Sequence, residues 1–272
     1  MTDLSDNRIV KTFAELRSAG KHTVLPFLTA GYPDLAATGA MLADLEGRGV
    51  RICELGIPFS DPIADGPTIQ ASYTEALATK VTSEKVFDMV GAYRAGGGRM
   101  ALVAMVSYSI VFRHEPEQYL RRAREAGFDG LIVPDLPLDE AAGVEAMAAA
   151  AGLCNTLLIA PTTPPQRRVE IAGHCSGFVY YMSVAGITGE RKVLPPDAIA
   201  AVGQLREHTD TPICVGFGIS SPQMVQTVCE VADGAIVGSA IVHRITDAKD
   251  GPRDQLVDSV GRFVGELLAP VL

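Results

Sequence analysis

The sequence predicts an α/β protein in which eight parallel strands alternate with helices and close into a barrel. Eight short apolar runs, ending in glycine, proline or a small polar residue, recur along the 272 residues, and helical spacing follows most of them. Such alternation requires parallel strands joined by crossover helices, and eight units allow the sheet to close. We therefore expect a single (β/α)8 TIM-barrel domain covering residues 1–272.

The apolar runs place the expected strands in order at residues 22–31, 50–56, 100–108, 129–135, 155–161, 177–186, 212–218 and 233–239. Apolar residues three and four apart, closed by glycine, predict helices at 34–49, 115–127 and 138–152. An extra helix should precede the first strand, because Ile9, Phe13 and Leu16 fall on one face. The three glycines at 96–98 are expected to end a long helix after the second strand rather than to separate domains.

A doubly wound open sheet is the alternative architecture. No G-x-G-x-x-G follows the first strand, and that fold seldom continues through eight units without a second domain. In a barrel the loops after the strands form the active face, which is where we look for functional residues.

Charge and composition exclude several classes of partner. The formal net charge is -9 with acidic and basic residues interleaved, which argues against nucleic-acid or membrane binding. The five cysteines lie mostly in apolar runs without C-x-x-C pairing and are expected to be reduced core residues. No secretion signal is recognisable, and no run approaches the roughly 18 apolar residues of a membrane span. We expect a cytoplasmic protein.

Glu54 is the first candidate catalytic residue. Side chains alternate along a strand, so Cys53 and Leu55 suit the helix side and Glu54 points into the barrel. Desolvation there would raise the pKa of the carboxyl group and suit it to acid and base catalysis near neutral pH. The alternative is a glutamate held in a structural ion pair.

The loop after this strand, IPFSDPIADGPTIQ, offers a second carboxylate. Prolines stiffen it, and Pro67 suits the first position of the next helix. Asp65, next to Gly66, could be only a turn former. Because the loop also carries Asp61 and follows the strand of Glu54, however, a carboxylate from it can reach the barrel mouth and complete an acid and base pair.

The last three strands are followed by glycine-bearing loops at 183–191, 215–222 and 236–242. Ser221 and Pro222 suit a helix start, as do Gly238 and Ser239, so helix N-termini can face an anion. A phosphate monoester is therefore expected there, although glycines can also simply end strands. The first of the three loops could be a mobile lid.

Two aromatic residues, Phe27 and Tyr180, could line an apolar chamber for a flat ligand or belong to the core. No histidine and carboxylate cluster has metal-ligand spacing, and no lysine ends a strand where a Schiff base would form. Acid and base chemistry without metal or cofactor is the remaining expectation.

The segments LPFLTAGYPD, ELGIPFSDPIADGPTIQ, GLIVPDLP, AGITG, VGFGIS and GSAIV resemble, in order, those of the tryptophan synthase α subunit family. The resemblance covers essentially the whole chain. It implies a lyase that splits indole-3-glycerol phosphate into indole and glyceraldehyde 3-phosphate by a retro-aldol step. Glu54 matches the acid and base of the family, and Asp65 matches the carboxylate that binds the indole N–H.

The resemblance also assigns binding and partner-facing residues. Substrate-binding positions are matched by Phe27, Tyr180, Thr188, Gly189, Gly218, Gly238 and Ser239. Positions facing a β subunit, whose pyridoxal phosphate condenses indole with serine, are matched by Asp61, Pro62 and Asp135. The implied assembly is a heterotetramer of two α and two β subunits, in which the β subunit favours the closed lid and raises activity.

One segment departs from the family pattern. Where relatives carry Y-x-N after the third strand, this chain has Ser107, Tyr108 and Ser109, which changes the polar groups near the substrate or the partner. Val184 stands where some relatives carry a charge. A ligand-sensing activator with little chemistry, and another phosphate-binding barrel enzyme such as a sugar-phosphate isomerase, are the alternative functions.

Overall fold

The computed structural model describes residues 3–62, 65–183, 196–216 and 218–272. Its strands all pair in parallel in one sheet, in the order β5-β4-β3-β2-β1-β9-β8-β7-β6. Their bounds are β1 Thr23–Thr29, β2 Ile52–Gly56, β3 Ala101–Met105, β4 Gly130–Ile132, β5 Cys154–Thr156, β6 Leu158–Ile159, β7 Val179–Met182, β8 Ile213–Gly216 and β9 Gly234–Val237. The two edge strands, β5 and β6, are consecutive in the chain, so the sheet is a nearly closed barrel.

The fifth predicted strand is divided into β5 and β6 at Leu157. β5 pairs with β4, whereas β6 pairs with β7. The Leu157 N–H donates to Cys175 Sγ at 3.3 Å instead of to a strand, while its carbonyl accepts from the Tyr180 N–H at 3.1 Å. The chain thus changes neighbours where the barrel closes, which is why eight predicted strands appear as nine.

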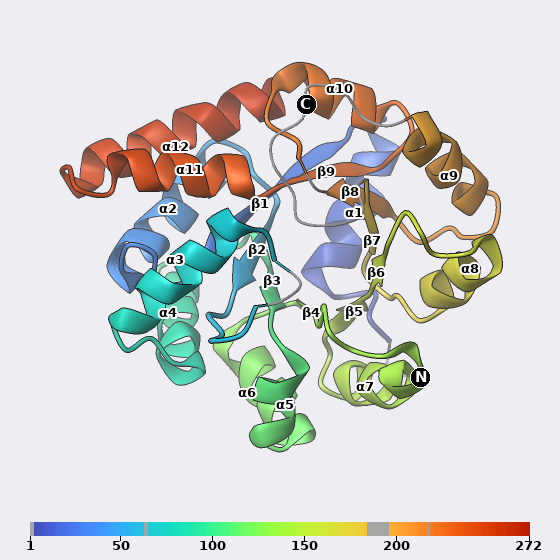
Figure 1. The fold of residues 1–272 in the computed structure, drawn as a ribbon, viewed down its shortest axis with the longest axis horizontal. Coiled ribbons are helices and arrows are strands. Elements are labelled where there is room, and N and C mark those ends of the chain that lie inside the picture. The colour runs from blue at the N-terminus through green and yellow to red at the C-terminus, as the bar shows by residue number, and fades with distance from the viewer. Residues whose placement is uncertain (1–2, 63–64, 184–195, 217) are drawn as a thin grey trace.

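Helices surround the strands, as the α/β alternation predicts (Figure 1). They are α1 Arg8–Ser18, α2 Leu35–Gly47, α3 Pro67–Ala78, α4 Ser83–Ala95, α5 Tyr108–Arg113, α6 Pro116–Ala126, α7 Leu138–Ala150, α8 Pro165–Gly173, α9 Pro196–Arg206, α10 Pro222–Cys229, α11 Ser239–Ala248 and α12 Arg253–Leu268, with the 3-10 helix η1 at Ala269–Val271. The predicted helices 34–49, 115–127 and 138–152 are confirmed as α2, α6 and α7. Pro67 begins α3 as predicted, with Gly66 as its N-cap.

The prediction of one long helix after the second strand is wrong. This segment forms α3 and α4, and Lys80 between them has φ 60, a left-handed conformation that a helix cannot contain. Thr82 then starts the second helix by accepting a hydrogen bond from the Lys85 N–H. Gly96 does end α4, as the glycine run suggested.

The predicted N-terminal helix, α1, lies behind the barrel in the view of Figure 1. Its buried face contains the three residues predicted to share it, Ile9, Phe13 and Leu16. Phe13 contacts Phe178, just before β7, with ring centroids 6.0 Å apart. Since this contact is at the start of a strand, α1 covers the end of the barrel opposite the loops that follow the strands.

All five cysteines are free and buried, as expected of core residues. No helix among the described residues is long and apolar enough to cross a membrane.

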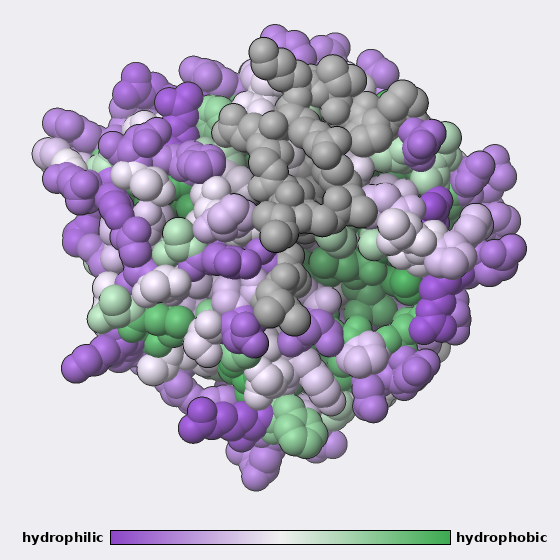
Figure 2. All heavy atoms as spheres, viewed as in Figure 1, coloured by the Kyte–Doolittle hydropathy of each residue, from purple (hydrophilic) through white to green (hydrophobic). Residues whose placement is uncertain are grey.

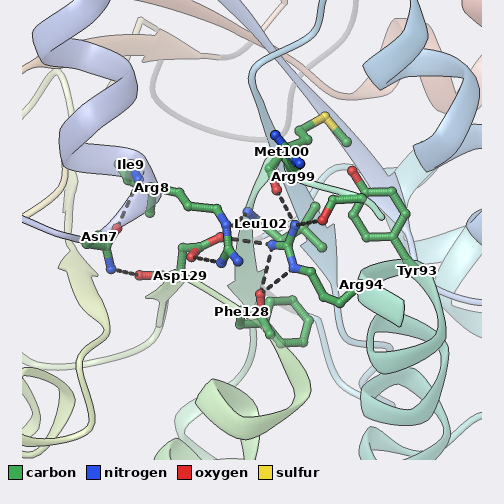
Figure 3. A network of polar contacts seen from close by, with 12 residues as sticks. Asn7, Arg8, Ile9, Tyr93, Arg94, Arg99, Met100, Leu102, Phe128 and Asp129 are labelled. Carbon is green, nitrogen blue, oxygen red and sulfur yellow. Dashed lines mark hydrogen bonds and ion pairs between the residues drawn. The ribbon is translucent and has the colours of Figure 1, made fainter. Parts of the chain in front are cut away.

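A fully buried carboxylate, Asp129, ties several elements together at the start of β4 (Figure 3). It accepts hydrogen bonds from Arg8 of α1 at 2.8 Å, Arg94 of α4 at 3.0 Å and Arg124 of α6 at 3.2 Å. The Leu102 backbone N–H, at the start of β3, also donates to it at 3.0 Å. Charge-assisted hydrogen bonds of this kind are among the strongest in proteins, so this end of the barrel serves stability.

Candidate active site

A cavity opens at the carboxyl ends of the strands, with about 610 Å³ of space free of protein atoms, part of it open to solvent. Viewed as in Figure 1, this face has a hollow where apolar residues gather and a largely hydrophilic periphery (Figure 2). The cavity is lined by Phe27, Glu54, Asp65, Gly66, Ile69, Met105, Pro134, Leu158, Tyr180, Gly218, Ile236, Gly238 and Ser239. All the predicted catalytic residues and most of the predicted substrate-binding residues are therefore brought together.

Glu54 lies in β2, paired with Phe27 of β1 and Val103 of β3. Its side chain lines the cavity, as strand alternation predicts, but is fully buried. Neither carboxyl oxygen has a hydrogen-bond partner among the described residues. The alternative, in which Glu54 forms a structural ion pair, is therefore wrong for every partner that the structure describes. Burial raises the pKa of Glu54 well above its usual value, which favours a protonated carboxyl group able to donate a proton.

Asp65 reaches the same cavity from the loop before α3. Its backbone N–H donates to the Pro62 carbonyl at 3.0 Å, and the Gln70 side chain donates to the Asp65 carbonyl at 2.8 Å. These contacts fix the loop through the backbone and hold Asp65 in the wall of the cavity. Burial raises the pKa of Asp65 to about 6. The two carboxyl groups therefore differ in environment, as an acid and base pair requires.

The N-terminus of α11 lines the cavity, and the loop before α10 reaches it at Gly218. Ser221 caps α10 by accepting from the Met224 N–H at 3.4 Å, and Gly238 precedes α11, whose first residue is Ser239. Gly218, Gly238 and Ser239 line the cavity. Unpaired N–H groups and the helix dipole favour an anion at such a place. Of the predicted binding residues, Thr188 and Gly189 lie outside the described residues.

The aromatic residues of the cavity depend on two glycines. Gly56, at the end of β2, leaves room for Phe27, because a Cβ at Gly56 would lie 2.5 Å from the tip of that ring. A Cβ at Gly216, at the end of β8, would likewise clash with the Tyr180 hydroxyl. Phe27 and Tyr180 are 4% and 5% exposed, so they are core residues that also form cavity walls.

A second cavity adjoins the first and shares Asp65, Met105 and Pro134 with it. The three predicted partner-facing residues, Asp61, Pro62 and Asp135, all line it.

The Asp135 carboxylate holds the start of α5, where the sequence departs from the family pattern. It accepts from the Ser107 hydroxyl at 2.7 Å and from the Tyr108 N–H at 2.8 Å. Ser107 in turn caps α5 and lies 2.9 Å from the Ser109 hydroxyl. The two serines therefore form a local polar network beside the second cavity.

Sequence reasoning missed several cavity residues. Met105, Leu158 and Ile236 belong to predicted strands, so the alternation that placed Glu54 could have identified them. Ile69 and Tyr73, which line the first and second cavities respectively, lie on the helix after the loop, and the face that a helix turns inward is set by packing. No cluster of three metal-ligating side chains occurs in the described ranges.

Comparisons with known proteins agree with this geometry. A family model described as "Tryptophan synthase alpha chain" matches residues 13–267. The tryptophan synthase alpha chain of Chloroflexus aggregans is 44% identical over 263 residues, with 97% of each chain covered. That of Rhodopirellula baltica is 43% identical, with 91% of this chain and 90% of the relative covered. The crystal structure of tryptophan synthase subunit alpha from Legionella pneumophila superposes with a TM-score of 0.88 at 33% identity, covering 97% of this chain and 98% of that one.

Proposed function

We propose that Glu54 and Asp65 are the catalytic pair of a chain that belongs to the tryptophan synthase alpha chain family and cleaves indole-3-glycerol phosphate in tryptophan biosynthesis. The reaction is a carbon–carbon lyase step, and this family uses no cofactor for it. The observation that carries the proposal is the fully buried carboxyl group of Glu54, which has no hydrogen-bond partner among the described residues. It lies in a cavity that is also lined by Asp65 and by the N-terminus of α11.

Glu54 moves the proton in this proposal. Its protonated carboxyl group donates to indole C3, which leaves a positively charged ring that withdraws electrons from the neighbouring bond. The resulting carboxylate removes the proton of the adjacent side-chain hydroxyl, the carbon–carbon bond breaks toward C3, and indole and glyceraldehyde 3-phosphate form. Glu54 has then given one proton to C3 and taken another from the hydroxyl group, so its carboxyl group ends protonated, as it began.

Asp65 stabilises the intermediate charge by accepting a hydrogen bond from the ring N–H. Because only its ionised form does this well, and its pKa lies at about 6, indole release should fall as the pH drops below about 6. Asp65→Asn is expected to lower kcat roughly 100-fold and to abolish this acid limb. A pH profile of indole release for both proteins checks the expectation; a parent-like rate in the variant would contradict the role.

The anionic end of the substrate is placed at Gly218, Gly238 and Ser239. Among the described residues, the nearest atom to a Cβ at Gly238 would be Phe27 Cβ, at an ordinary 3.6 Å, which leaves room for a small side chain. Gly238→Asp should raise KM for indole-3-glycerol phosphate roughly 10- to 100-fold by charge repulsion, whereas the similarly shaped Gly238→Asn should have a much smaller effect. Equal KM values in the two variants would place the phosphate elsewhere.

The partner follows from the same family. Solved structures of Mycobacterium tuberculosis tryptophan synthase contain a chain similar to this one, with a TM-score of 0.85 at 31% identity. We place a β subunit on Asp61, Pro62 and Asp135, in a heterotetramer of two α and two β subunits, with the loop around Thr188 and Gly189 as the lid. The whole chain would act as one domain in the cytoplasm. Sedimentation of the mixed subunits checks the assembly.

A further inference from the structure

Tyr73 lies beside the carboxyl groups of the site, although no motif identified it. It belongs to α3, about two turns after Asp65, and is 3% exposed. The same face of the helix buries Ile69, Ser72 and Ala76. The aromatic ring is therefore held against the barrel by the packing of α3, which leaves the position of its hydroxyl group well determined.

Gly56 shows where that hydroxyl group lies. A Cβ at Gly56 would be 2.5 Å from the Tyr73 hydroxyl oxygen as well as from the tip of the Phe27 ring. Glu54 and Gly56 are two residues apart in β2 and so face the same side, about 7 Å apart along the strand. The hydroxyl group thus occupies the barrel mouth directly beyond Glu54, in space that a side chain at position 56 would fill.

Tyr73 also borders a cavity that Asp65 lines. Tyr73 and Asp65 both line the second cavity, and Asp65 lines the first as well. Neither the Tyr73 hydroxyl nor the Asp65 carboxylate makes a hydrogen bond to another side chain in the part of the chain that the structure describes. A hydroxyl group can donate a hydrogen bond and an ionised carboxylate can accept one, so the two groups suit each other as partners.

Electrostatics keep the phenol in its neutral form. Burial raises the pKa of Tyr73 well above its usual value, and the neighbouring carboxyl groups, Asp65 before Glu54, raise it further. A neutral phenol can donate its proton in a hydrogen bond, and an ionised carboxylate can only accept. In a hydrogen bond between them, the Tyr73 hydroxyl is therefore the donor and the Asp65 carboxylate the acceptor.

We propose that Tyr73 is a positioning residue of this site, whose hydroxyl donates a hydrogen bond to one oxygen of Asp65 while the other oxygen accepts the ring N–H of the substrate. This inference rests on the proposed catalytic role of Asp65 and adds a residue to it. Tyr73 does not touch the reacting atoms; it aligns Asp65 and keeps it ionised in the substrate complex.

Tyr73→Phe removes only the hydroxyl oxygen and tests the assignment. Hydrogen bonds to charged groups contribute enough that kcat for indole release should fall roughly ten-fold, with KM changed little. Because the lost donor stabilised the carboxylate, the acid limb of the kcat profile should move to higher pH. The other ionisable groups around this space are Glu54, Asp61, Asp135 and Tyr180, and all remain in the variant.

A matched control is Tyr119→Phe. Tyr119 is also 3% exposed, and its hydroxyl group donates to Ser83 on the outer helices at 3.4 Å. This variant should keep the parent rate and acid limb. Thermal unfolding of both variants checks that each is folded.

The double variant Asp65→Asn, Tyr73→Phe separates positioning from a general structural effect. If Tyr73 acts through Asp65, removing the hydroxyl should cost little once Asp65 is asparagine. A parent-like Tyr73→Phe, or a full ten-fold loss that persists in the Asp65→Asn background, would overturn the assignment of Tyr73 alone. Parent-like activity of Asp65→Asn by itself would instead overturn the proposed function of the carboxyl pair.

Discussion

Glu54→Gln should lower indole release by about 1,000-fold while the variant still binds indole-3-glycerol phosphate. Glutamine has nearly the shape of glutamic acid, so the fully buried position in β2 accepts it without repacking. It cannot give a proton to indole C3 and take another from the side-chain hydroxyl. The loss should therefore appear in kcat, with substrate affinity close to that of the parent protein.

Steady-state rates and calorimetric titration with substrate measure these two quantities separately. Glu145→Gln is a suitable control, because Glu145 pairs with His174 at 2.7 Å on the outer helices and not in the cavity. Its rate should match that of the parent. Indole release at the parent rate by Glu54→Gln would show that another group moves the proton.

Asp129→Ala should produce the largest loss of stability, about 3 kcal/mol in the free energy of unfolding. The carboxylate is fully buried and pairs with Arg8 and Arg94 (Figure 3), and also with Arg124. The Arg94 side chain is only 12% exposed. Without the Asp129 carboxylate, these positive charges lose their counterion and the Leu102 N–H at the start of β3 loses its acceptor. This single substitution therefore weakens the attachment of α1, α4 and α6 to the barrel.

Urea unfolding followed by circular dichroism measures this change. Asp258→Ala is the matched control, because Asp258 also pairs with arginines, Arg48 at 3.1 Å and Arg262 at 2.8 Å, but is 51% exposed. Solvent screens such pairs, so the control should lose less than about 1 kcal/mol. A similar loss of unfolding free energy in the two variants would mean that burial does not determine how much Asp129 stabilises the fold.

The barrel and the position of Glu54 followed from local patterns. Strand alternation alone directs Glu54 inward, and the order of strands and helices alone requires a parallel sheet. The division of the fifth strand at Leu157 depends on which neighbours the chain meets as the barrel closes. The break between α3 and α4 depends on one left-handed residue, Lys80, and lysine carries no strong preference for that conformation.

Within the site, residues on strands and capped helix starts were the predictable ones. Ser221 and Gly238 precede helices in sequence, so their position at N-termini could be anticipated. Tyr73 could not be anticipated, because its proximity to Asp65 requires the packing of α3 on the barrel and the missing side chain of Gly56. The contact between Ser107 and Asp135 joins loops after β3 and β4, and no local pattern encodes it.

The most direct test of the account is a crystal structure of Glu54→Gln with indole-3-glycerol phosphate bound. We expect the amide of residue 54 within about 3.5 Å of indole C3, a distance at which the parent carboxyl group could transfer a proton. The ring N–H should face Asp65, and the phosphate should lie on the N–H groups at Gly218, Gly238 and Ser239. A substrate whose C3 lies beyond reach of residue 54, or whose phosphate binds away from these loops, would contradict the account.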